Sequence, residues 1–381
     1  MREGWSKRKI EEIATITMGQ SPSGNSINET EGVEFHQGKI YFGEKYINES
    51  HFYTSEPIRI AKPNSLLLCV RAPIGVVNMT ARKICIGRGL CSIKANDSIH
   101  SNFLYYALRS QKDYFNKNAT GSTFLAISSN VVKDTQISFP SKDKQIQIAS
   151  ELDKITEMIS KYDEQLKELD KLSQSIFYEM FGDPVENEKG WEVKKLGYIC
   201  DVRDGTHDSP KYVLKSEYIL ITSKNIVNGR IDFDNVNFIT EEDYVQINKR
   251  SKVDDGDIIM PMIGTIGNPI IVQTNNIYKF CIKNVALIKF INEATIKNLF
   301  LLYLLKTTAY AEYLISLNKG GTQKFVSLGI IRNLPIILPP LALQQSFARK
   351  IEAIEAMKSK VREAKKEAET LLAARMQYWF E

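Results

Sequence analysis

Two long segments of the chain carry apolar residues at alternating steps of about four and three. In the first, residues 143–183, these are Ile148, Leu152, Ile155, Ile159, Tyr162, Leu166 and Leu169, and Gly182-Asp183-Pro184 ends the pattern. In the second, residues 341–381, they are Phe347, Ile351, Ile354, Met357, Val361, Ala364, Ala368 and Leu371. A repeat of about 3.5 residues is typical of a coiled-coil seam. We therefore predict two long antiparallel helices that pair through these residues; the alternative is that each helix packs only on its own domain.

The chain also repeats itself on a larger scale. Gly4-Trp5 returns 186 residues later as Gly190-Trp191, whereas Pro140 and Phe181 return 199 residues later as Pro339 and Phe380. An offset that first grows and then stays constant indicates loop insertions before the helices and none within them. This predicts a mixed domain over residues 1–142, a spacer helix over 143–183, a second mixed domain over 184–340 and a C-terminal spacer helix over 341–381.

The two mixed domains combine short strands with short helices. Apolar runs predict strands at Ser65–Val70, Ile84–Ile86, Cys91–Lys94, Ile137–Phe139, Tyr218–Thr222, Asp257–Met260, Val285–Ile291 and Pro335–Leu338. Helical spacing occurs at Asn102–Ser110 and Ile296–Thr307. The expected fold class is therefore α+β: two mixed α/β domains in a pseudo-twofold tandem repeat, separated by the two long coiled-coil helices.

Charge is distributed unevenly along the chain. Residues 1–142 carry a net charge of +6 and residues 184–340 carry +2, while the first predicted long helix carries −5 and the second +2. The opposite signs of the helices favour their pairing, and net-basic domains suit a polyanionic partner. With no long apolar segment and five cysteines in no Cys-x-x-Cys pattern, we expect a cytoplasmic protein without disulfides or a metal site.

Motifs for common catalytic chemistry are absent from the sequence. The four histidines show no metal-ligand spacing, and there is no phosphate-binding loop, dinucleotide fingerprint or nucleophile elbow. There is also no Asn-Pro-Pro-aromatic tetrapeptide of the kind that amino-methyltransferases carry. We therefore predict a protein that is not an enzyme, with no catalytic residue and no metal ligand of its own.

Several phrases in both halves resemble one family. They are Arg71-Ala72-Pro73-Ile74-Gly75 with Ile84-Cys85-Ile86-Gly87-Arg88-Gly89-Leu90, Ile263-Gly264-Thr265-Ile266-Gly267 with Lys283-Asn284-Val285-Ala286-Leu287, and Ser175-Ile176-Phe177-Tyr178-Glu179-Met180-Phe181-Gly182-Asp183-Pro184. Together with the repeat, they resemble the specificity (S) subunits of type I restriction–modification enzymes, over essentially the whole chain and in the right order.

The resemblance implies two target-recognition domains, each of which reads one half of a bipartite asymmetric site in double-stranded DNA. It implies that the long helices are the conserved regions that separate the domains and dock two methyltransferase (M) subunits, which restriction (R) subunits join. S-adenosylmethionine, ATP and Mg are then expected on those partners, and this chain needs no cofactor. Two alternatives remain: the recognition subunit of a bipartite type II restriction–methylation enzyme, and a coiled-coil adaptor that binds only proteins.

Candidate DNA contacts are polar and basic residues in loops near glycines. Arginine paired with guanine and glutamine paired with adenine are common base contacts, and glycine with lysine or a hydroxyl allows close approach to phosphate. In the first domain the candidates are Gln20, Ser21, Lys39, Arg71, Arg82, Arg88, Lys117 and Thr123; in the second they are His207, Lys211, Lys224, Asn225, Arg230, Lys319, Thr322 and Lys324. One hypothesis is that aromatic rings stack on bases, at Tyr105, Tyr106 and Tyr303. Their helical spacing instead favours a place in the core.

Overall fold

A computed structural model of the chain describes residues 2–121, 125–227, 229–263, 267–275, 277–292, 295–317 and 325–381. The chain divides into two compact units. Unit 1 comprises Met1–Asp163 and Glu363–Glu381, and unit 2 comprises Glu164–Arg362. Both units mix helices with strands, as predicted, and each is described in turn.

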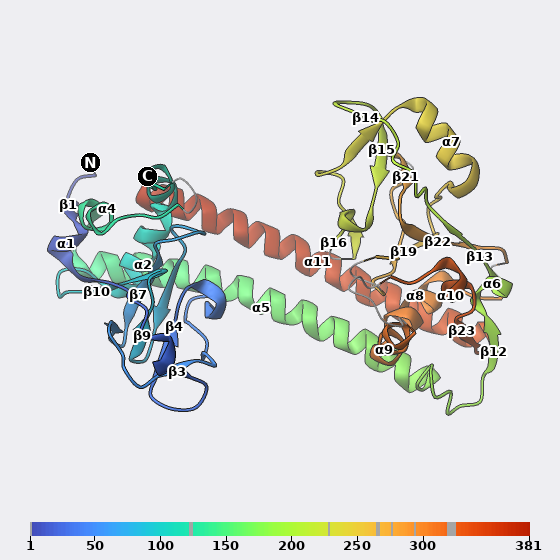
Figure 1. The fold of residues 1–381 in the computed structure, drawn as a ribbon, viewed down its shortest axis with the longest axis horizontal. Helices are drawn as coiled ribbons and strands as arrows, with labels where there is room; N and C mark the ends of the chain where they lie inside the picture. The colour runs from blue at the N-terminus through green and yellow to red at the C-terminus, as the bar shows by residue number, and fades with distance from the viewer. Residues whose placement is uncertain are drawn as a thin grey trace. The chain divides into compact units, whose positions relative to one another are not determined.

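Two long helices, α5 (Lys142–Phe181) and α11 (Leu341–Phe380), contain 40 residues each and appear in green and red in Figure 1. Each begins shortly after a proline, and α5 ends where Gly182 adopts a φ of +76°, a conformation that glycine reaches without steric cost. The prediction of two long helices is confirmed. Each helix contributes one segment to unit 1 and one to unit 2.

In unit 1, the two helix segments run antiparallel. Arg375 forms an ion pair with Glu151, and Lys365 lies 2.6 Å from Asp163, so residue numbers rise along α5 as they fall along α11. Ile148, Leu152 and Ile155 are buried, whereas Ile159 and Tyr162 are half-buried. The apolar face of the helix pair therefore becomes less enclosed away from the mixed domain.

Unit 2 repeats this antiparallel arrangement with its own segments of the helices. Asp170 accepts from the buried Lys358 at 2.6 Å, and Phe347 packs against Phe177 and Phe181. The three predicted seam residues at the start of α11, Phe347, Ile351 and Ile354, are buried. In the middle of the two helices, the seam residues Leu166, Leu169 and Val361 are half-buried.

The expected seam of α11 needs a correction. The apolar pattern predicts Leu371 and Met357 in it, but these residues are 46% and 55% exposed. The strict alternation of four and three continues instead through Lys358, Lys365 and Leu372, and Leu372 packs against the unit 1 core. Lysine occupies a seam position because its aliphatic stem packs on apolar surface while its ammonium group pairs with an aspartate.

Unit 1 is built around an antiparallel sheet that α2 covers and a second, mixed sheet in which β4 and β9 run parallel. Within the described residues, the sheet orders are β2-β10-β7-β8, β3-β5-β4-β9-β6 and β1-β11. Its elements before α5 are β1 (Ser6–Lys9), α1 (Ile10–Ile13), β2 (Ala14–Met18), η1 (Gly24–Ser26), β3 (Ile27–Asn28), β4 (Val33–His36), η2 (Lys39–Tyr41), β5 (Tyr53–Thr54), β6 (Ile60–Ala61), β7 (Ser65–Cys69), β8 (Val77–Thr80), β9 (Ile84–Ile86), β10 (Leu90–Ala95), α2 (Ser101–Ser110), α3 (Lys112–Lys117), α4 (Ser129–Asp134) and β11 (Gln136–Phe139).

Unit 2 has the corresponding sheets with one added helix, α7. In the part of the chain that the structure describes, the sheet orders are β13-β22-β19-β20, β14-β18-β15-β21, β12-β23 and β16-β17. Its elements before α11 are β12 (Glu192–Lys195), α6 (Leu196–Ile199), β13 (Cys200–Asp204), β14 (Tyr212–Val213), β15 (Tyr218–Ile221), η3 (Ser223–Asn225), β16 (Ile226–Val227), β17 (Arg230–Ile231), β18 (Asn237–Ile239), α7 (Glu241–Ser251), β19 (Ile258–Pro261), β20 (Ile270–Ile271), β21 (Lys279–Ile282), β22 (Val285–Phe290), α8 (Asn298–Lys306), α9 (Thr308–Ser316), α10 (Leu328–Arg332) and β23 (Pro335–Leu338).

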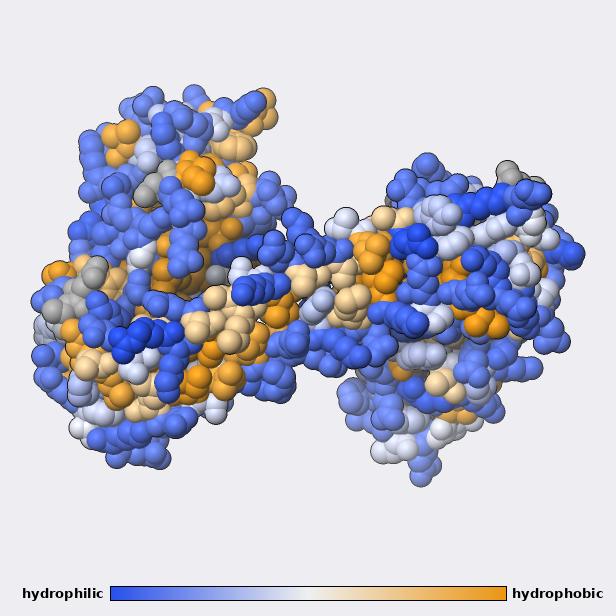
Figure 2. All heavy atoms as spheres, turned by 180° about the vertical axis from the view of Figure 1, so that it is seen from behind, coloured by the Kyte–Doolittle hydropathy of each residue, from blue (hydrophilic) through white to orange (hydrophobic). Residues whose placement is uncertain are grey.

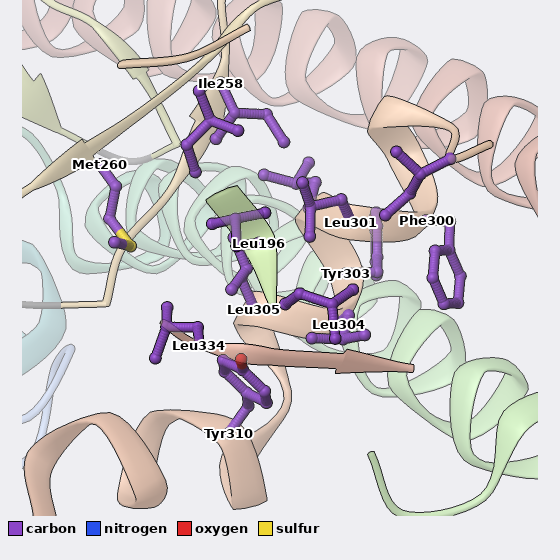
Figure 3. Close-up of a cluster of buried hydrophobic side chains, with 14 of the residues drawn as sticks. Leu196, Ile258, Met260, Phe300, Leu301, Tyr303, Leu304, Leu305, Tyr310 and Leu334 are labelled. Atoms are coloured by element: carbon purple, nitrogen blue, oxygen red, sulfur yellow. The ribbon is translucent and has the colours of Figure 1, made fainter. Parts of the chain in front are cut away.

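The predicted strands and short helices of both domains are confirmed within a residue or two. The core of unit 2 explains why they form: side chains of β19, α6, α8 and α9 converge on one apolar cluster (Figure 3). Tyr310 is fully buried there, and its hydroxyl donates to the Pro335 carbonyl oxygen at 3.0 Å. Tyr105, Tyr106 and Tyr303 are buried as well, which confirms them as core residues.

A buried glutamine joins each long helix to its mixed domain. In unit 1, the Gln145 amide donates to the Pro140 carbonyl at 2.9 Å and accepts from the His100 amide at 2.7 Å. In unit 2, Gln344 donates to the Pro339 carbonyl at 2.9 Å and accepts from the Lys297 amide at 2.9 Å. The same bonds recur because these glutamines occupy equivalent places in the repeat.

Within the described residues, no helix combines the length and the hydropathy that crossing a membrane requires. The five cysteines are free and buried.

Truncating the buried seam tests the correction to α11. Leu152→Ala removes a fully buried side chain and should lower the free energy of unfolding by about 2–5 kcal/mol, because it leaves a cavity in the unit 1 core. Leu371→Ala should change it by less than about 0.5 kcal/mol, because that residue is 46% exposed and lies outside the buried seam. Denaturant unfolding of the full chain measures both, and an equal loss from the two variants would restore Leu371 to the seam.

Candidate nucleic-acid interface

Backbone hydrogen bonds join several loops of unit 1 into one edge. The Gly19 amide donates to the Leu90 carbonyl at 2.8 Å, and the Gln20 amide donates to the Ile86 carbonyl at 3.0 Å. On the neighbouring strand, the Gly87 amide donates to the His36 carbonyl at 2.8 Å. The loops after β2, β4 and β9 therefore meet at one place.

The loop after β7 belongs to the same edge. The Val70 amide donates to the Gly89 carbonyl at 3.0 Å, and Val70 in turn accepts from the Ile127 amide at 2.9 Å. Arg71 forms an isolated bridge with Ala126. We call residues 19–21, 36–40, 70–75, 86–90 and 117–127, as far as they are described, the loop edge of unit 1.

Unit 2 builds an equivalent loop edge with the same hydrogen bonds. Gly205 donates to Val285 at 3.0 Å, and Thr206 donates to Ile282 at 3.0 Å. The Lys283 backbone amide donates to the carbonyl oxygen of Ile221, at the end of β15, and the Val326 amide donates to the carbonyl oxygen of Met262. The described residues of 205–209, 221–225, 262–263, 282–285 and 325–326 form the loop edge of unit 2.

Glycine is required where the loops cross. A Cβ atom at Gly19 would clash with the backbone carbonyl of Gly87, and one at Gly205 would clash with the carbonyl of Ile282. Any side chain at either position would force strand β2 or β13 away from its neighbour. The framework of the two loop edges is thus backbone in both units, which leaves the side chains beyond it free to differ.

Four of the predicted residues of the first domain project from its loop edge. Gln20, Lys39, Arg71 and Arg88 are exposed. Ser21 lies among them, with its hydroxyl donating to the side chain of Gln37 at 2.8 Å. Gln37 is exposed as well and is not among the predicted contacts, although it lies beside Gly38 and Lys39 much as Gln20 lies beside Gly19.

Arg82 has partners within the domain instead. Its guanidinium donates twice to Glu34, at 2.6 Å each, and also to the carbonyl oxygens of Ile47 and Asn48. Burial raises the pKa of Glu34, but hydrogen bonds, led by those from Arg82, outweigh it and hold the pKa below its ordinary value. This arrangement gives Arg82 a structural role in holding loops together; its predicted DNA contact stays a prediction.

The second domain places His207, Lys224 and Asn225 on its loop edge, and Lys211 and Arg230 lie outside it. Lys211, Lys224 and Arg230 are exposed on the segments that follow β13, β15 and β16. Asn225, by contrast, is buried: its side-chain oxygen accepts from Thr222, and its amide donates to the Asn235 carbonyl at 2.9 Å. Asn225 therefore shapes the turn around Lys224.

The glycine-containing loops predicted to approach phosphate lie largely outside the described residues. Lys117 is exposed at the end of α3, in the segment that leads to the unit 1 loop edge. The other members, Thr123, Lys319, Thr322 and Lys324, lie outside the described residues.

Two further residues of the second loop edge, Lys283 and Asn284, are not among the contacts predicted from the sequence. Lys283 donates to the Ser209 hydroxyl at 3.0 Å, and the side-chain oxygen of Asn284 lies 2.8 Å from the His207 ring. The repeat itself was the available signal, because Asn284 occupies the place of Arg88 just after the crossing strand.

The chemistry of both edges suits nucleic acid. Arginine, lysine, glutamine and asparagine provide hydrogen-bond donors for base edges and phosphates. Among the residues that the structure describes, no group of three or more histidine, cysteine or acidic side chains has the arrangement of a metal site.

Comparison with known proteins identifies the fold and the family. A family model for the type I restriction modification DNA specificity domain matches residues 2–171 and again residues 188–369. The two matches fall on the two halves of the repeat.

Curated relatives carry the same description. The putative type I restriction enzyme MjaX specificity subunit of Methanocaldococcus jannaschii is 36% identical over 168 residues, which cover 44% of this chain and 39% of that protein. The MjaIX specificity subunit of the same organism is 27% identical over 90% of this chain and 85% of its own length. The EcoBI specificity subunit of Escherichia coli is 21% identical over 93% of this chain and 80% of its own.

Solved structures share the fold. The type I restriction–modification S subunit from M. genitalium has a TM-score of 0.56 at 17% identity, over 98% of this chain and 95% of that one. A chain from a study of complex assembly and conformational transition of the type I system has a TM-score of 0.57 at 17% identity, over 100% and 98%. With the family model matching both halves, the chain belongs to the type I restriction–modification DNA specificity family.

Proposed function

We propose that this chain is the DNA-recognition subunit of a type I restriction–modification complex, and that each unit reads one half of a bipartite asymmetric site. The observation that carries the proposal is the loop edge, which recurs in both units with the same backbone hydrogen bonds and different side chains. A repeated framework suits binding to the same kind of ligand twice. Different side chains suit two different half-sites.

The side-chain differences are specific. Ser21 and Arg88 of unit 1 correspond to His207 and Asn284 of unit 2, and Arg71 corresponds to Ile263. Arginine favours guanine, whereas asparagine and histidine present other donors and acceptors. Phosphate contacts from the exposed lysines would position each unit on the duplex, and these side chains would specify the bases.

The long helices are proposed to dock two methyltransferase subunits. Each unit exposes one methionine and one leucine on its helix segments: Met158 and Leu371 in unit 1, Met357 and Leu172 in unit 2, all between 39% and 55% exposed. The ion pairs between the helices set a register in which the two members of each pair lie at the same level. Two equivalent apolar patches suit two copies of one partner.

Unit 2 also exposes apolar surface in space-filling view. On the face drawn in Figure 2, hydrophobic side chains gather over the helices of unit 2, at the left. Leu169 and Ile176, on α5, are half-buried against the apolar core of this unit.

Catalysis and its cofactors are assigned to the partners in this proposal. Methyltransferase subunits would bind S-adenosylmethionine, and restriction subunits would bind ATP and Mg. The chain itself would then contribute recognition and assembly, acting in the cytoplasm where the DNA is. The absence of recognisable catalytic motifs in the sequence supports this division of labour.

Charging one patch should remove one partner. Met357→Glu should leave a complex with a single methyltransferase subunit, because only the unit 2 patch loses its apolar contact, and Met158→Glu should do the same through unit 1. Native mass spectrometry of the co-expressed complex measures the stoichiometry. Val193→Glu, at a strand residue that is 48% exposed, is the control and should retain two subunits. Loss of both subunits from either single variant would contradict independent docking.

Exchanging one mixed domain should change one half-site. When residues 184–340 are replaced by the same region of a family member with another specificity, we expect one half of the methylated sequence to change and the other to persist. The reciprocal exchange of residues 1–142 should change the other half. Sequencing of methylated positions in cells that express each chimera with its methyltransferase provides the readout. A change in both halves from one exchange would mean that the units do not read independently.

A further inference from the structure

His207 is held between two hydrogen-bond partners on the loop edge of unit 2. Its Nε2 atom lies 2.7 Å from a carboxylate oxygen of Asp204, and its Nδ1 atom lies 2.8 Å from the side-chain oxygen of Asn284. The Asp204 side chain is 8% exposed and also pairs with Arg250, whereas the His207 side chain is 53% exposed. The imidazole is therefore held in place by Asp204 and Asn284, and its exposed part is accessible to a ligand.

Both partners of the imidazole present oxygen atoms. A neutral histidine carries one N–H group, so it donates to only one of two acceptors, whereas the imidazolium donates to both. The arrangement therefore belongs to the protonated ring. Loss of the proton would break one bond or turn the Asn284 amide over, so that its NH2 group faces the ring.

The charged groups around His207 come from several elements. Asp204 lies on β13, Arg250 on α7, and Lys283 next to Asn284 on the turn between β21 and β22. The hydrogen bond to Asp204, followed by that to Asn284, raises the pKa of His207 above its ordinary value, although burial and the charge of Arg250 oppose this. The carboxylate thus outweighs the nearby cation.

Asn284 is placed to meet a ligand. It adopts a φ of +55°, which asparagine tolerates better than most residues, and it stands at the same place in unit 2 as Arg88 does in unit 1. Its oxygen is engaged by His207, while its Nδ2 atom has no hydrogen-bond partner among the described residues. An amide held in this way offers donors outward.

We propose that Asn284, oriented by protonated His207, is a specificity-determining residue of unit 2 and donates to the major-groove edge of a guanine. Guanine is the base with two acceptors, N7 and O6, on that edge. Adenine pairs best with an asparagine that donates and accepts at once, and here His207 already occupies one of the two acceptor positions of the oxygen and holds it toward the ring. The inference rests on the proposed function, in that unit 2 must contact DNA.

Asn284→Asp is the most direct test of the contact. Aspartate tolerates the same backbone conformation and keeps an oxygen for His207, but it has no donor for guanine. In cells that express the full chain with its methyltransferase, we expect discrimination for guanine at one position of one half-site to fall by roughly 5- to 150-fold, the range of a good base contact. The other half-site should persist, which also shows that the variant folds and assembles.

The outcome of this mapping separates two failures. A wild-type chain that directs no bipartite methylation would overturn the proposed function. A wild-type chain that directs bipartite methylation, with a second half-site that Asn284→Asp leaves unchanged, would overturn only the reading role of Asn284. If the aspartate variant fails to assemble, the His207 variant below decides.

The role of His207 as a cation predicts a pH dependence confined to one half-site. Because a raised pKa favours the protonated ring, the bond to Asn284 is present at low pH and is lost as pH rises through the pKa of His207. Affinity of the assembled complex for DNA, measured between about pH 5.5 and about pH 8.5, should therefore fall with rising pH, and substituting the second half-site in the DNA should abolish this trend.

His207→Ser introduces the residue that unit 1 has at the equivalent place, Ser21, and should remove the pH dependence while retaining assembly. The matched control is His51→Gln, which changes an exposed histidine of unit 1 that contacts the ring of Tyr41, and it should keep the wild-type pH profile. A His207→Ser complex with the wild-type profile would overturn the positioning role of His207.

Discussion

The hydrogen bonds of one buried glutamine in each unit are the constraint on which the rest of the structure depends. Gln145 and Gln344 are 1% and 0% exposed, and each bonds the strand end before its helix and the loop that leads into α2 or α8. A buried amide that lost these partners would cost about 1–3 kcal/mol for each unsatisfied group. The start of each long helix is thereby tied to the mixed domain that it follows.

Beyond these glutamines, the buried faces of the long helices belong to the same apolar cores as the mixed domains. Leu152 belongs to the same apolar cluster as α2 and the strands of unit 1, and Phe347 belongs to the cluster of α8 in unit 2. The opposite helix segment then adds ion pairs, such as Asp163 with Lys365, where the seam is less enclosed. Hydrophobic burial thus provides stability near the domains, and paired charges maintain the register farther along.

The loop edges, too, are held together by a small set of interactions. Backbone hydrogen bonds define them, with Gly19 and Gly205 where the loops cross, so their exposed side chains contribute little to the stability of the fold. Arg82, outside the loop edge of unit 1, and the buried Asn225, within that of unit 2, are exceptions whose side chains bond to the protein itself. The proposed role in DNA recognition uses this separation, because substitutions that alter recognition would then leave the fold intact.

The sequence by itself determined the two long helices, the tandem repeat, most of the strands and the family, because apolar spacing and recurring phrases are local properties. It did not determine which positions of α11 face α5. Choosing apolar residues led to Met357 and Leu371, whereas the tertiary structure buries Lys358, because an aspartate on the other helix compensates its charge. Nor did it separate Arg82 from Arg88, which lie close together in the chain with similar surroundings. Only the fold decided that Glu34 binds the first while the second projects from the loop edge, since hydrogen-bond partners distant in sequence are brought together by packing alone.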